Sequence, residues 1–142
     1  MVRLMRTKEV ALLAEIWLAA SLIAHDFIPA AFWRARVELI KTAYLGKSIT
    51  YVYEEQGELL GFISFAQAGK IGGIFVAPAA QGRGIGFALI NQAKKLFNEL
   101  ELEVYARNVN AVHFYLRQDF QAILSYQGKD TGEASYRMRW SE

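Results

Sequence analysis

Cysteine is absent from this sequence of 142 residues. Its absence excludes a disulfide framework, a thiolate nucleophile and a zinc site with cysteine ligands. Proline is also scarce, with two residues, and no linker, internal repeat or low-complexity tract divides the chain. One hydrophobic core can serve a chain of this length, so we predict a single domain over residues 1–142.

A large charge of either sign is missing as well. With 16 Lys and Arg against 14 Asp and Glu, the net charge is +2, which is too small by itself to indicate a nucleic-acid or membrane surface. The apolar run at 10–24 follows basic residues as in a secretory signal, but Glu15 interrupts it and it is shorter than the ~20 residues of a membrane span. We therefore expect a buried helix here, and a soluble cytoplasmic protein with no nucleic-acid or membrane partner.

Apolar residues make up 54% of the sequence, enough for a sizeable core. Their helical spacing predicts helices at 8–24, 30–45, 84–96 and 109–118. Runs of β-branched and aromatic residues predict strands at 2–5, 49–54, 59–65, 71–76, 100–106, 120–126 and 136–140. Hairpins come first in this order and a βαβ crossover follows, so we expect an α+β fold with a mixed sheet and helices packed on it.

The most informative segment is VAPAAQGRGIGFALI at 76–90, where Gly82, Gly84 and Gly86 alternate with other residues between a predicted strand and a predicted helix. A dinucleotide fingerprint, G-x-G-x-x-G, fits neither possible frame, because no glycine stands at its last position. A P-loop fails too, because the GKS tripeptide at 46–48 lacks the glycine required five residues earlier. The spacing thus excludes a nucleotide-binding module of either type.

What remains is the pattern Q-x-x-G-x-G, from Gln81 to Gly86, after a strand and at a helix start. Unpaired backbone N–H groups at a helix N-terminus bind anions, and glycines allow the backbone to approach a pyrophosphate closely. Arg83 adds a cation. The alternative is a plain strand-to-helix turn, which a lone G-x-G favours, so the surrounding residues decide.

Those surroundings resemble the GNAT superfamily of acyl-CoA-dependent N-acyltransferases. The similarity rests on IFVAP at 74–78, QGRGIG at 81–86, LEVYARN at 102–108 and AVHFY at 111–115, and AHDFIPAAFW at 24–33 resembles small single-domain bacterial members. It extends over nearly the whole chain. The resemblance implies a GNAT-type twisted, mostly antiparallel central sheet of six to seven strands with about four helices on its faces, acetyl-CoA as co-substrate, and no metal.

The resemblance also implies a donor site. The family holds the CoA pyrophosphate by main-chain N–H groups and aligns the pantetheine arm with the preceding strand, like an added β-strand. Gly72 and Gly73 lie where the family often has a bulge, and glycine inside a strand independently indicates a bulge or close backbone approach. The candidate donor-binding residues are Ile74, Phe75, Val76, Gln81, Gly82, Arg83, Gly84, Ile85, Gly86, Phe87 and Asn108. A plain helix N-cap is the alternative for Asn108.

Acetyl transfer requires a neutral amine, a donor for the oxyanion and a proton for the leaving thiolate. In the family a main-chain N–H on the strand at 74–76 usually serves the oxyanion. Tyr115 matches the tyrosine that supplies the last proton; its alternative is a packed tyrosine whose hydroxyl is satisfied elsewhere. Glu103 resembles the base of members that acetylate protein N-termini; its alternative is a solvated strand face shared with Glu101.

The acceptor side carries weaker signals. His25 and Asp26 lie in the link between the first two helices, which borders the acceptor pocket in the family, but a helix end and a cap explain them as well. Asp119 stands where the family has a glycine, and aspartate tolerates a left-handed helix end. An aromatic group could shape the acceptor site or simply pack the core: Trp17, Phe27, Phe32 and Trp33.

These residues together imply an acetyl-CoA-dependent N-acetyltransferase that acts on a primary amine. The acceptor is a protein lysine or N-terminus, or a small amine, and the enzyme is a monomer or homodimer. The alternative from another class is a CoA-binding sensor without turnover, favoured if Glu103 faces away from the cleft. The acceptor itself depends on side chains at 17–33 and 126–135, for which no transferable code exists.

Overall fold

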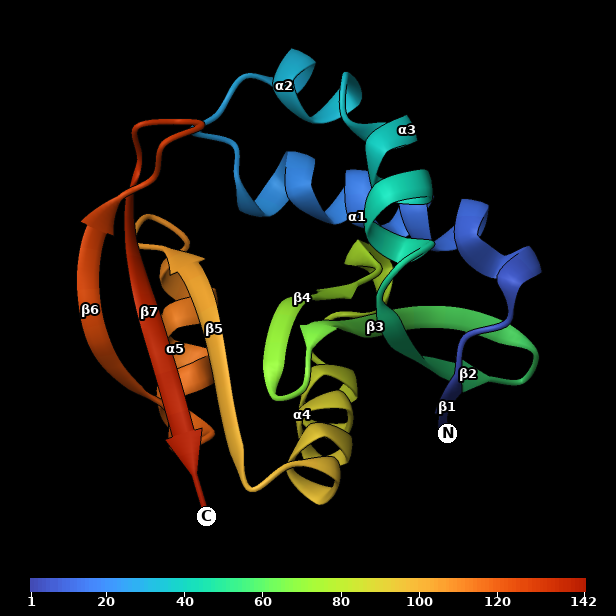
Figure 1. The fold of residues 1–142 in the computed structure, drawn as a ribbon. Helices are drawn as coiled ribbons and strands as arrows, with labels where there is room; N and C mark the ends of the chain where they lie inside the picture. Colours follow the sequence, from blue (N-terminus) through green and yellow to red (C-terminus); the bar gives the residue numbers. More distant parts are fainter.

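The backbone forms a seven-stranded sheet of order β1-β2-β3-β4-β5-β7-β6 in the computed structural model, which describes residues 1–142 (Figure 1). Every neighbouring pair is antiparallel except β4 and β5. The expected mixed, mostly antiparallel sheet is therefore confirmed. The strands are β1 (Val2–Leu4), β2 (Ile49–Glu55), β3 (Glu58–Gln67), β4 (Lys70–Val76), β5 (Glu99–Tyr105), β6 (Gln121–Gln127) and β7 (Ala134–Ser141).

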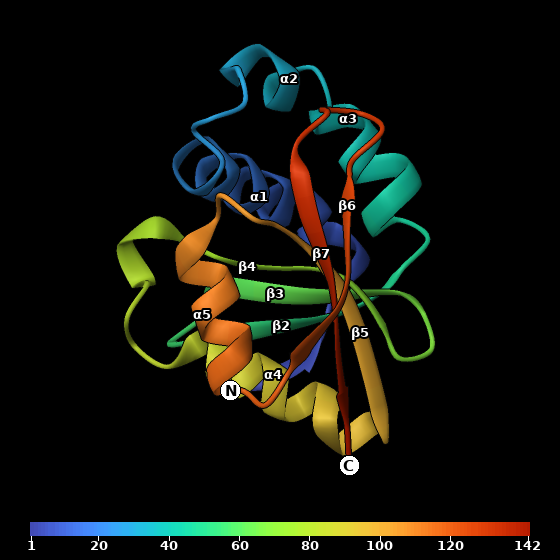
Figure 2. The ribbon, with the colours of Figure 1, turned by 90° about the vertical axis from the view of Figure 1, so that its left-hand side faces the viewer.

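Helices cover both faces of this sheet. The N-terminal helices lie above the strands and α4 lies below them (Figure 2). None of these helices is both long enough and apolar enough to cross a membrane. The helices are α1 (Val10–Ala24), α2 (Ala30–Arg34), α3 (Val37–Leu39), α4 (Ile85–Leu96) and α5 (Val109–Arg117).

The prediction of one helix over 30–45 is wrong. The segment is broken between α2 and α3, and α3 continues as a π-helical turn, Ile40–Leu45. Arg36 Nη1 donates to the Phe32 carbonyl at 2.9 Å, and the Thr42 hydroxyl donates to the Glu38 carbonyl at 2.9 Å. Side chains that donate hydrogen bonds to helical carbonyls compete with the regular backbone hydrogen bonds of an α-helix. The spacing of apolar residues gives no indication of this competition. The other predicted elements agree with the structure to within about two residues at each end.

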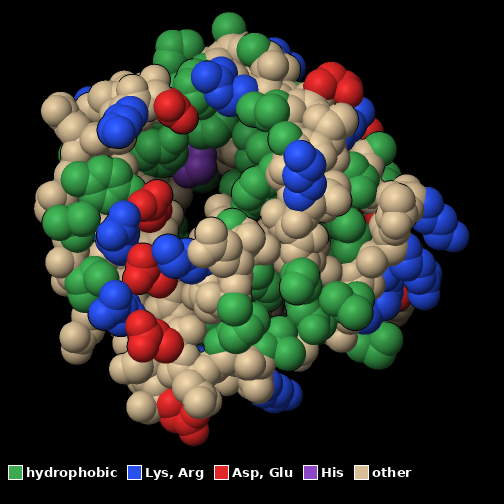
Figure 3. All heavy atoms as spheres, in the orientation of Figure 1, with side chains coloured by type: hydrophobic (Ala, Val, Ile, Leu, Met, Phe, Trp, Pro, Cys, Tyr) green, Lys and Arg blue, Asp and Glu red, His purple; other side chains and the backbone are tan.

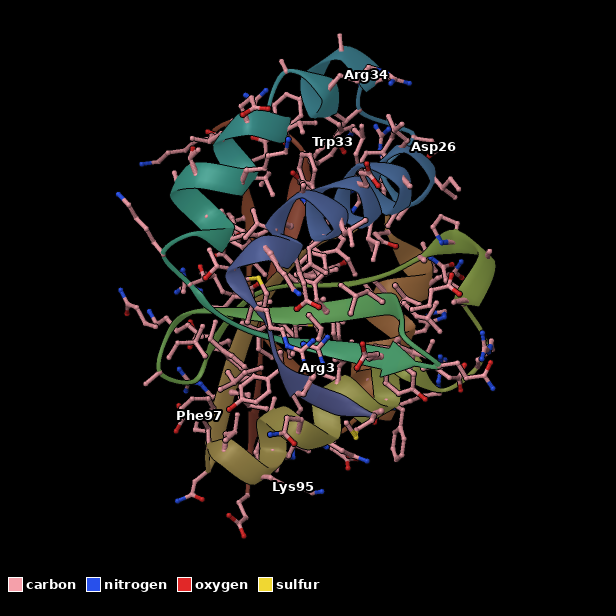
Figure 4. All side chains as sticks on the ribbon, turned by 90° about the vertical axis from the view of Figure 1, so that its right-hand side faces the viewer. Arg3, Asp26, Trp33, Arg34, Lys95 and Phe97 are labelled. Carbon is pink, nitrogen blue, oxygen red and sulfur yellow. The ribbon has the colours of Figure 1, made fainter.

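Two apolar clusters fix the helices on the sheet. The cluster against α4 and α5 has 15 buried residues, including Phe65, Leu89 and Phe120. The cluster against α1 has seven, including Trp17 and Trp33, and Figure 4 shows Trp33 between α1 and the α2–α3 segment. Burial of one such side chain contributes about 1.5–3 kcal/mol. The two faces of the sheet are therefore packed by separate apolar clusters.

The sheet opens between β4 and β5. These parallel strands pair only at Lys70 and Glu101, and they separate beyond that point (Figure 1). Between Ile71 and Gly73, the pairing of β4 with β3 skips Gly72, so the glycine pair contains the bulge that it predicted. The edge of β4 that faces β5 therefore has no partner strand from the bulge to Val76. Such an edge is a template for an added strand.

Candidate active site

A cleft of about 1220 Å³ occupies the opening between β4 and β5. One wall consists of β4, the loop after it and α5; the other consists of α1, α2 and the turn between β6 and β7. Figure 3 shows a hollow bordered by hydrophobic side chains with a histidine at its base, and His25 is the histidine that lines the cleft. All the candidate donor-binding and catalytic residues named from the sequence line this cleft except Arg83.

The glycine loop presents unpaired backbone donors to the cleft. Gly82 and Gly84 have φ of 79° and 82°, and a Cβ at either position would meet no atom within 4 Å. The left-handed conformation, rather than space, therefore requires glycine there. None of the N–H groups from Gly82 to Phe87 donates a hydrogen bond within the protein, because they precede or begin α4. Such a run of free donors at a helix start is an anion-binding concavity.

The polar side chains of this loop contact other groups of the protein. Gln81 Nε2 donates to the Val76 carbonyl at 3.2 Å, so its amide closes the turn back onto the end of β4. Arg83 is paired with Glu55 and does not line the cleft. Arg117, in the last turn of α5, lines the cleft and has no acidic partner. An exposed arginine carries no sequence signal of its own, and the sequence analysis missed it.

Tyr115 projects into the cleft from α5. Its side chain packs against Phe114 and Phe120, with ring centroids 5.3 and 5.8 Å away. Burial raises the pKa of Tyr115 well above its ordinary value, so the phenol is protonated at neutral pH. Its hydroxyl makes no hydrogen bond to another protein group. Asp119 ends α5 with φ of 70°, the left-handed conformation predicted for it.

Asn108 begins α5 but does not cap it with its side chain. Instead its Nδ2 lies 3.2 Å from His25 Nε2, which opposes the plain N-cap interpretation. Burial lowers the pKa of His25 to about 4, so the ring is neutral at pH 7. Asp26, next along the chain, is exposed and does not line the cleft.

Aromatic side chains form the wall opposite the glycine loop. Trp17, Phe32 and Trp33 line the cleft, and the two tryptophans are also buried in the core. Trp17 and Trp33 therefore belong both to the core and to the lining of the cleft. Phe27 packs against the same core and lies 5.7 Å from the Tyr105 ring, but does not itself line the cleft.

Two carboxylates line the cleft, Glu103 and Asp130. Glu103 accepts a hydrogen bond from Arg137 at 3.3 Å. Burial, together with the neighbouring Glu103 carboxylate, raises the pKa of Tyr126 to about 12. Glu101 shares the strand face and also contacts Arg137, yet it does not line the cleft. Glu101 and Glu103 are equivalent in the sequence pattern, but in the structure only Glu103 lines the cleft. Asp130 lies in the β6–β7 turn, where no pattern pointed to it.

Tyr44 is a further residue that the sequence analysis missed. It lies on the π-helical turn and lines the cleft. Its hydroxyl is buried without a hydrogen-bond partner. No apolar spacing or motif marks it, because its position depends on the irregular path of the chain after α3.

A model of the family described as "Acetyltransferase (GNAT) domain" matches residues 21–142. The chain belongs to the GNAT family. The GNAT chain is 36% identical over 140 residues to the peptidyl-lysine N-acetyltransferase YiaC of Escherichia coli (strain K12), which covers 99% of this chain and 96% of YiaC. It is accordingly an N-acetyltransferase that uses acetyl-CoA, as the resemblance implied.

Solved structures share the GNAT fold. The apo-form of YjaB from Escherichia coli aligns with a TM-score of 0.87 at 23% identity and covers 99% of this chain and 96% of that chain. The PaiA N-acetyltransferase from Thermoplasma acidophilum, in complex with coenzyme A, aligns with a TM-score of 0.84 at 15% identity and covers 100% of this chain and 98% of that chain. These likenesses confirm the predicted GNAT-type fold.

The residues of this GNAT cleft fit an acyl-CoA. The free N–H groups from Gly82 to Phe87 suit a pyrophosphate. The unpaired edge of β4 suits an extended arm that carries amide groups. No group of three His, Asp or Glu side chains is placed to hold a metal ion.

Proposed function

We propose that this GNAT member transfers the acetyl group of acetyl-CoA to the side-chain amine of lysine residues in proteins. The observation that carries the proposal is one continuous cleft that joins the free N–H groups of the glycine loop to Tyr115 and Glu103. The relationship to YiaC, a peptidyl-lysine N-acetyltransferase, supports lysine as the acceptor. We further propose that the enzyme works in the cytoplasm, as a monomer or homodimer, without nucleic-acid or membrane partners.

The donor lies along β4 in this proposal. Main-chain N–H groups from Gly82 to Phe87 hold the pyrophosphate, and Arg117 supplies the cation that Arg83 does not. The pantetheine arm then runs back along the open edge of β4 from Val76 through Phe75 to Ile74. Asn108 faces the arm from the start of α5 and hydrogen-bonds one of its amides.

Transfer begins when the neutral lysine amine attacks the thioester carbonyl. A free lysine has a pKa of ~10.4, so about one in a few thousand molecules is neutral at pH 7. We assign Glu103 as the group that accepts the proton, directly or through one water. Main-chain N–H groups of β4 near Ile74 stabilise the oxyanion that forms. Aromatic residues around Trp33 pack the aliphatic part of the lysine side chain.

Tyr115 protonates the departing thiolate. For a free phenol and a free thiol this transfer is uphill by about 2 kcal/mol, from pKa values of ~10 and ~8.5. Burial raises the pKa of the phenol further, but the same desolvation raises the pKa of a thiol in the cleft, because both anions lose water. The two shifts offset each other, and the proton is held on Tyr115 until the thiolate appears beside it.

Thiol release tests the proposal directly, because a chain without cysteine gives no protein background. Acetyl-CoA and a lysine peptide with a blocked α-amine should release free CoA at a rate that depends on the peptide. Tyr115→Phe should lower kcat about 10²-fold. The matched control is Tyr51→Phe, a tyrosine of β2 that does not line the cleft, and it should retain activity within about twofold.

Two outcomes would contradict the proposal. Turnover with a free peptide N-terminus or a small amine, and none with the blocked lysine peptide, would reassign the acceptor. Tight binding of acetyl-CoA with no turnover on any of these amines, or on protein extract, would indicate a sensor.

A further inference from the structure

Tyr44 has a hydroxyl group that the protein leaves unused. The side chain is largely buried and lines the same cleft as Tyr115. Its oxygen is shielded from solvent and has no hydrogen-bond partner. Buried polar groups without partners are rare because they are costly to a fold, and at functional sites a ligand commonly supplies the missing partner.

The phenol of Tyr44 rests on the backbone at the bulge of β4. A Cβ built on Gly72 would overlap the Tyr44 hydroxyl oxygen and would lie 2.9 Å from its Cζ. Gly72 is therefore glycine because the Tyr44 ring occupies the space of a side chain. The hydroxyl consequently lies at the point where β4 turns away from β5.

This point coincides with the reacting end of the proposed donor. The pyrophosphate loop follows the C-terminal end of β4, so an arm that pairs with the strand runs backwards from Val76 toward Gly72. Four residues of strand span ~13 Å, and the arm ends at the bulge. A second phenol, that of Tyr115, lines the same cleft.

We propose that the Tyr44 hydroxyl donates a hydrogen bond to the carbonyl oxygen of the thioester and to the oxyanion that develops from it. This inference rests on the acetyltransferase mechanism proposed above. The amine nitrogen forms the new bond to the carbonyl carbon, and the carbonyl electron pair moves to the oxygen that Tyr44 contacts. The tetrahedral species then collapses, the carbon–sulfur bond breaks, and Tyr115 protonates the thiolate. Tyr44 keeps its own proton throughout.

Burial suits Tyr44 to this role. A desolvated phenol is protonated across the working pH range, so its O–H is always available as a donor. Donors aimed at the position where charge develops act most strongly in a site that excludes water, and they cost no reorganisation when the reaction occurs. Main-chain N–H groups of β4 and the Tyr44 hydroxyl would then approach the same oxygen from the strand and from the π-helical turn.

Removal of the hydroxyl alone tests the assignment. Tyr44→Phe keeps the ring on Gly72 and should lower kcat about 10- to 100-fold, while the KM for acetyl-CoA changes less than about threefold. Tyr51→Phe is the control for loss of a tyrosine hydroxyl elsewhere. Thermal unfolding should give the same midpoint for Tyr44→Phe and wild type within a few degrees. A Tyr44→Phe enzyme that is folded and has wild-type kcat would overturn the proposal.

A binding comparison extends the test beyond turnover. S-ethyl-CoA replaces the thioester carbonyl by a methylene and so removes the acceptor of the proposed hydrogen bond. In calorimetry the wild type should bind acetyl-CoA about 3- to 10-fold more tightly than S-ethyl-CoA, and Tyr44→Phe should bind the two within about twofold. If both proteins preferred acetyl-CoA over S-ethyl-CoA to the same extent, the role of Tyr44 would be refuted. This binding test does not depend on turnover. A wild type that acetylated no lysine peptide would instead refute the proposed function.

Discussion

The Nε2 atom of His25 lies 3.2 Å from Nδ2 of Asn108 and so joins the end of α1 to the start of α5, 83 residues later. His25 belongs to the wall that faces the acceptor, and Asn108 to the wall that faces the donor. The contact fixes the orientation of an amide that helix capping leaves free. The two walls of the cleft are thereby held at a set distance from each other.

Loss of this contact should weaken donor binding more than it slows the chemistry. His25→Ala should raise the KM for acetyl-CoA about 3- to 10-fold, the effect of one hydrogen bond of ~1 kcal/mol, and leave kcat within about threefold. His25→Gln places an amide near the position of Nε2 and should restore part of the loss. Steady-state kinetics against acetyl-CoA measure both. A fall in kcat alone, unrelieved by glutamine, would contradict a positioning role.

The two glutamates of β5 should differ in their effect on turnover. Glu103→Gln removes a carboxylate of the cleft wall and should lower kcat at least about tenfold at pH 7. The deficit should shrink at higher pH, where more of the acceptor amine is already neutral. Glu101→Gln is the matched control, because it removes the same group from the same strand face outside the cleft. If both variants changed the pH profile equally, Glu103 would not be the base, and the proton of the acceptor amine would pass to water or to Asp130.

The two arginines near the donor should also differ. Arg83 pairs with Glu55 outside the cleft, so Arg83→Ala should change the KM for acetyl-CoA less than about twofold. Arg117 lines the cleft without an acidic partner, and Arg117→Ala should raise that KM about 3- to 10-fold, with a difference from wild type that narrows at high salt. Initial rates at two ionic strengths give the comparison. The reverse order of the two arginines would restore Arg83 as the phosphate cation.

Acid should remove a specific contribution to stability at the N-terminus. Arg3 lies beneath α1 (Figure 4) and donates to both oxygens of the nearly buried Glu9, at 3.0 and 2.7 Å. Hydrogen bonds from Arg3 lower the pKa of Glu9 from 4.5 to about 2. The carboxylate therefore stabilises the fold above pH about 4.5, and this contribution is lost as the pH falls toward 2.

Urea unfolding of wild type and Glu9→Gln measures that contribution. At pH 7 the variant should be about 1–3 kcal/mol less stable, because a charged hydrogen-bonding partner of Arg3 is gone. The gap should narrow progressively below pH about 4.5. A gap that stays constant from pH 7 to pH 3.5 would show that the pairing with Arg3 is not its source.

Much of this fold was predictable because its signals are local. The alternation of apolar residues along β5 and their helical spacing along α4 indicate which face of each element is buried. Both patterns involve only residues that are close in the sequence. The broken helix after Pro29 was not predictable in the same way, because Arg36 and Thr42 take up backbone carbonyls that a regular helix would have used. Hydrophobic periodicity contains no information about such competition.

The residues of the site likewise divide into those marked by local sequence signals and those placed by long-range contacts. Gly82 and Gly84 were recognisable because a left-handed backbone demands glycine wherever the loop occurs. The direction of the Arg83 side chain depends on Glu55, 28 residues away, and no local pattern encodes it. The position of the Tyr44 side chain depends on the bulge in β4, a distant segment of the chain. Long-range partners of this kind become visible only when the chain is folded.

The single pairing of β4 with β5 means that the two halves of the sheet are joined mainly by side chains. The cluster against α4 and α5 includes Ile71 of β4 and Leu102 of β5, so it spans both halves. On the cleft side only one backbone pair joins these two strands. The shape of the donor cleft therefore depends on the packing of a core that lies behind it, as well as on the residues that line it.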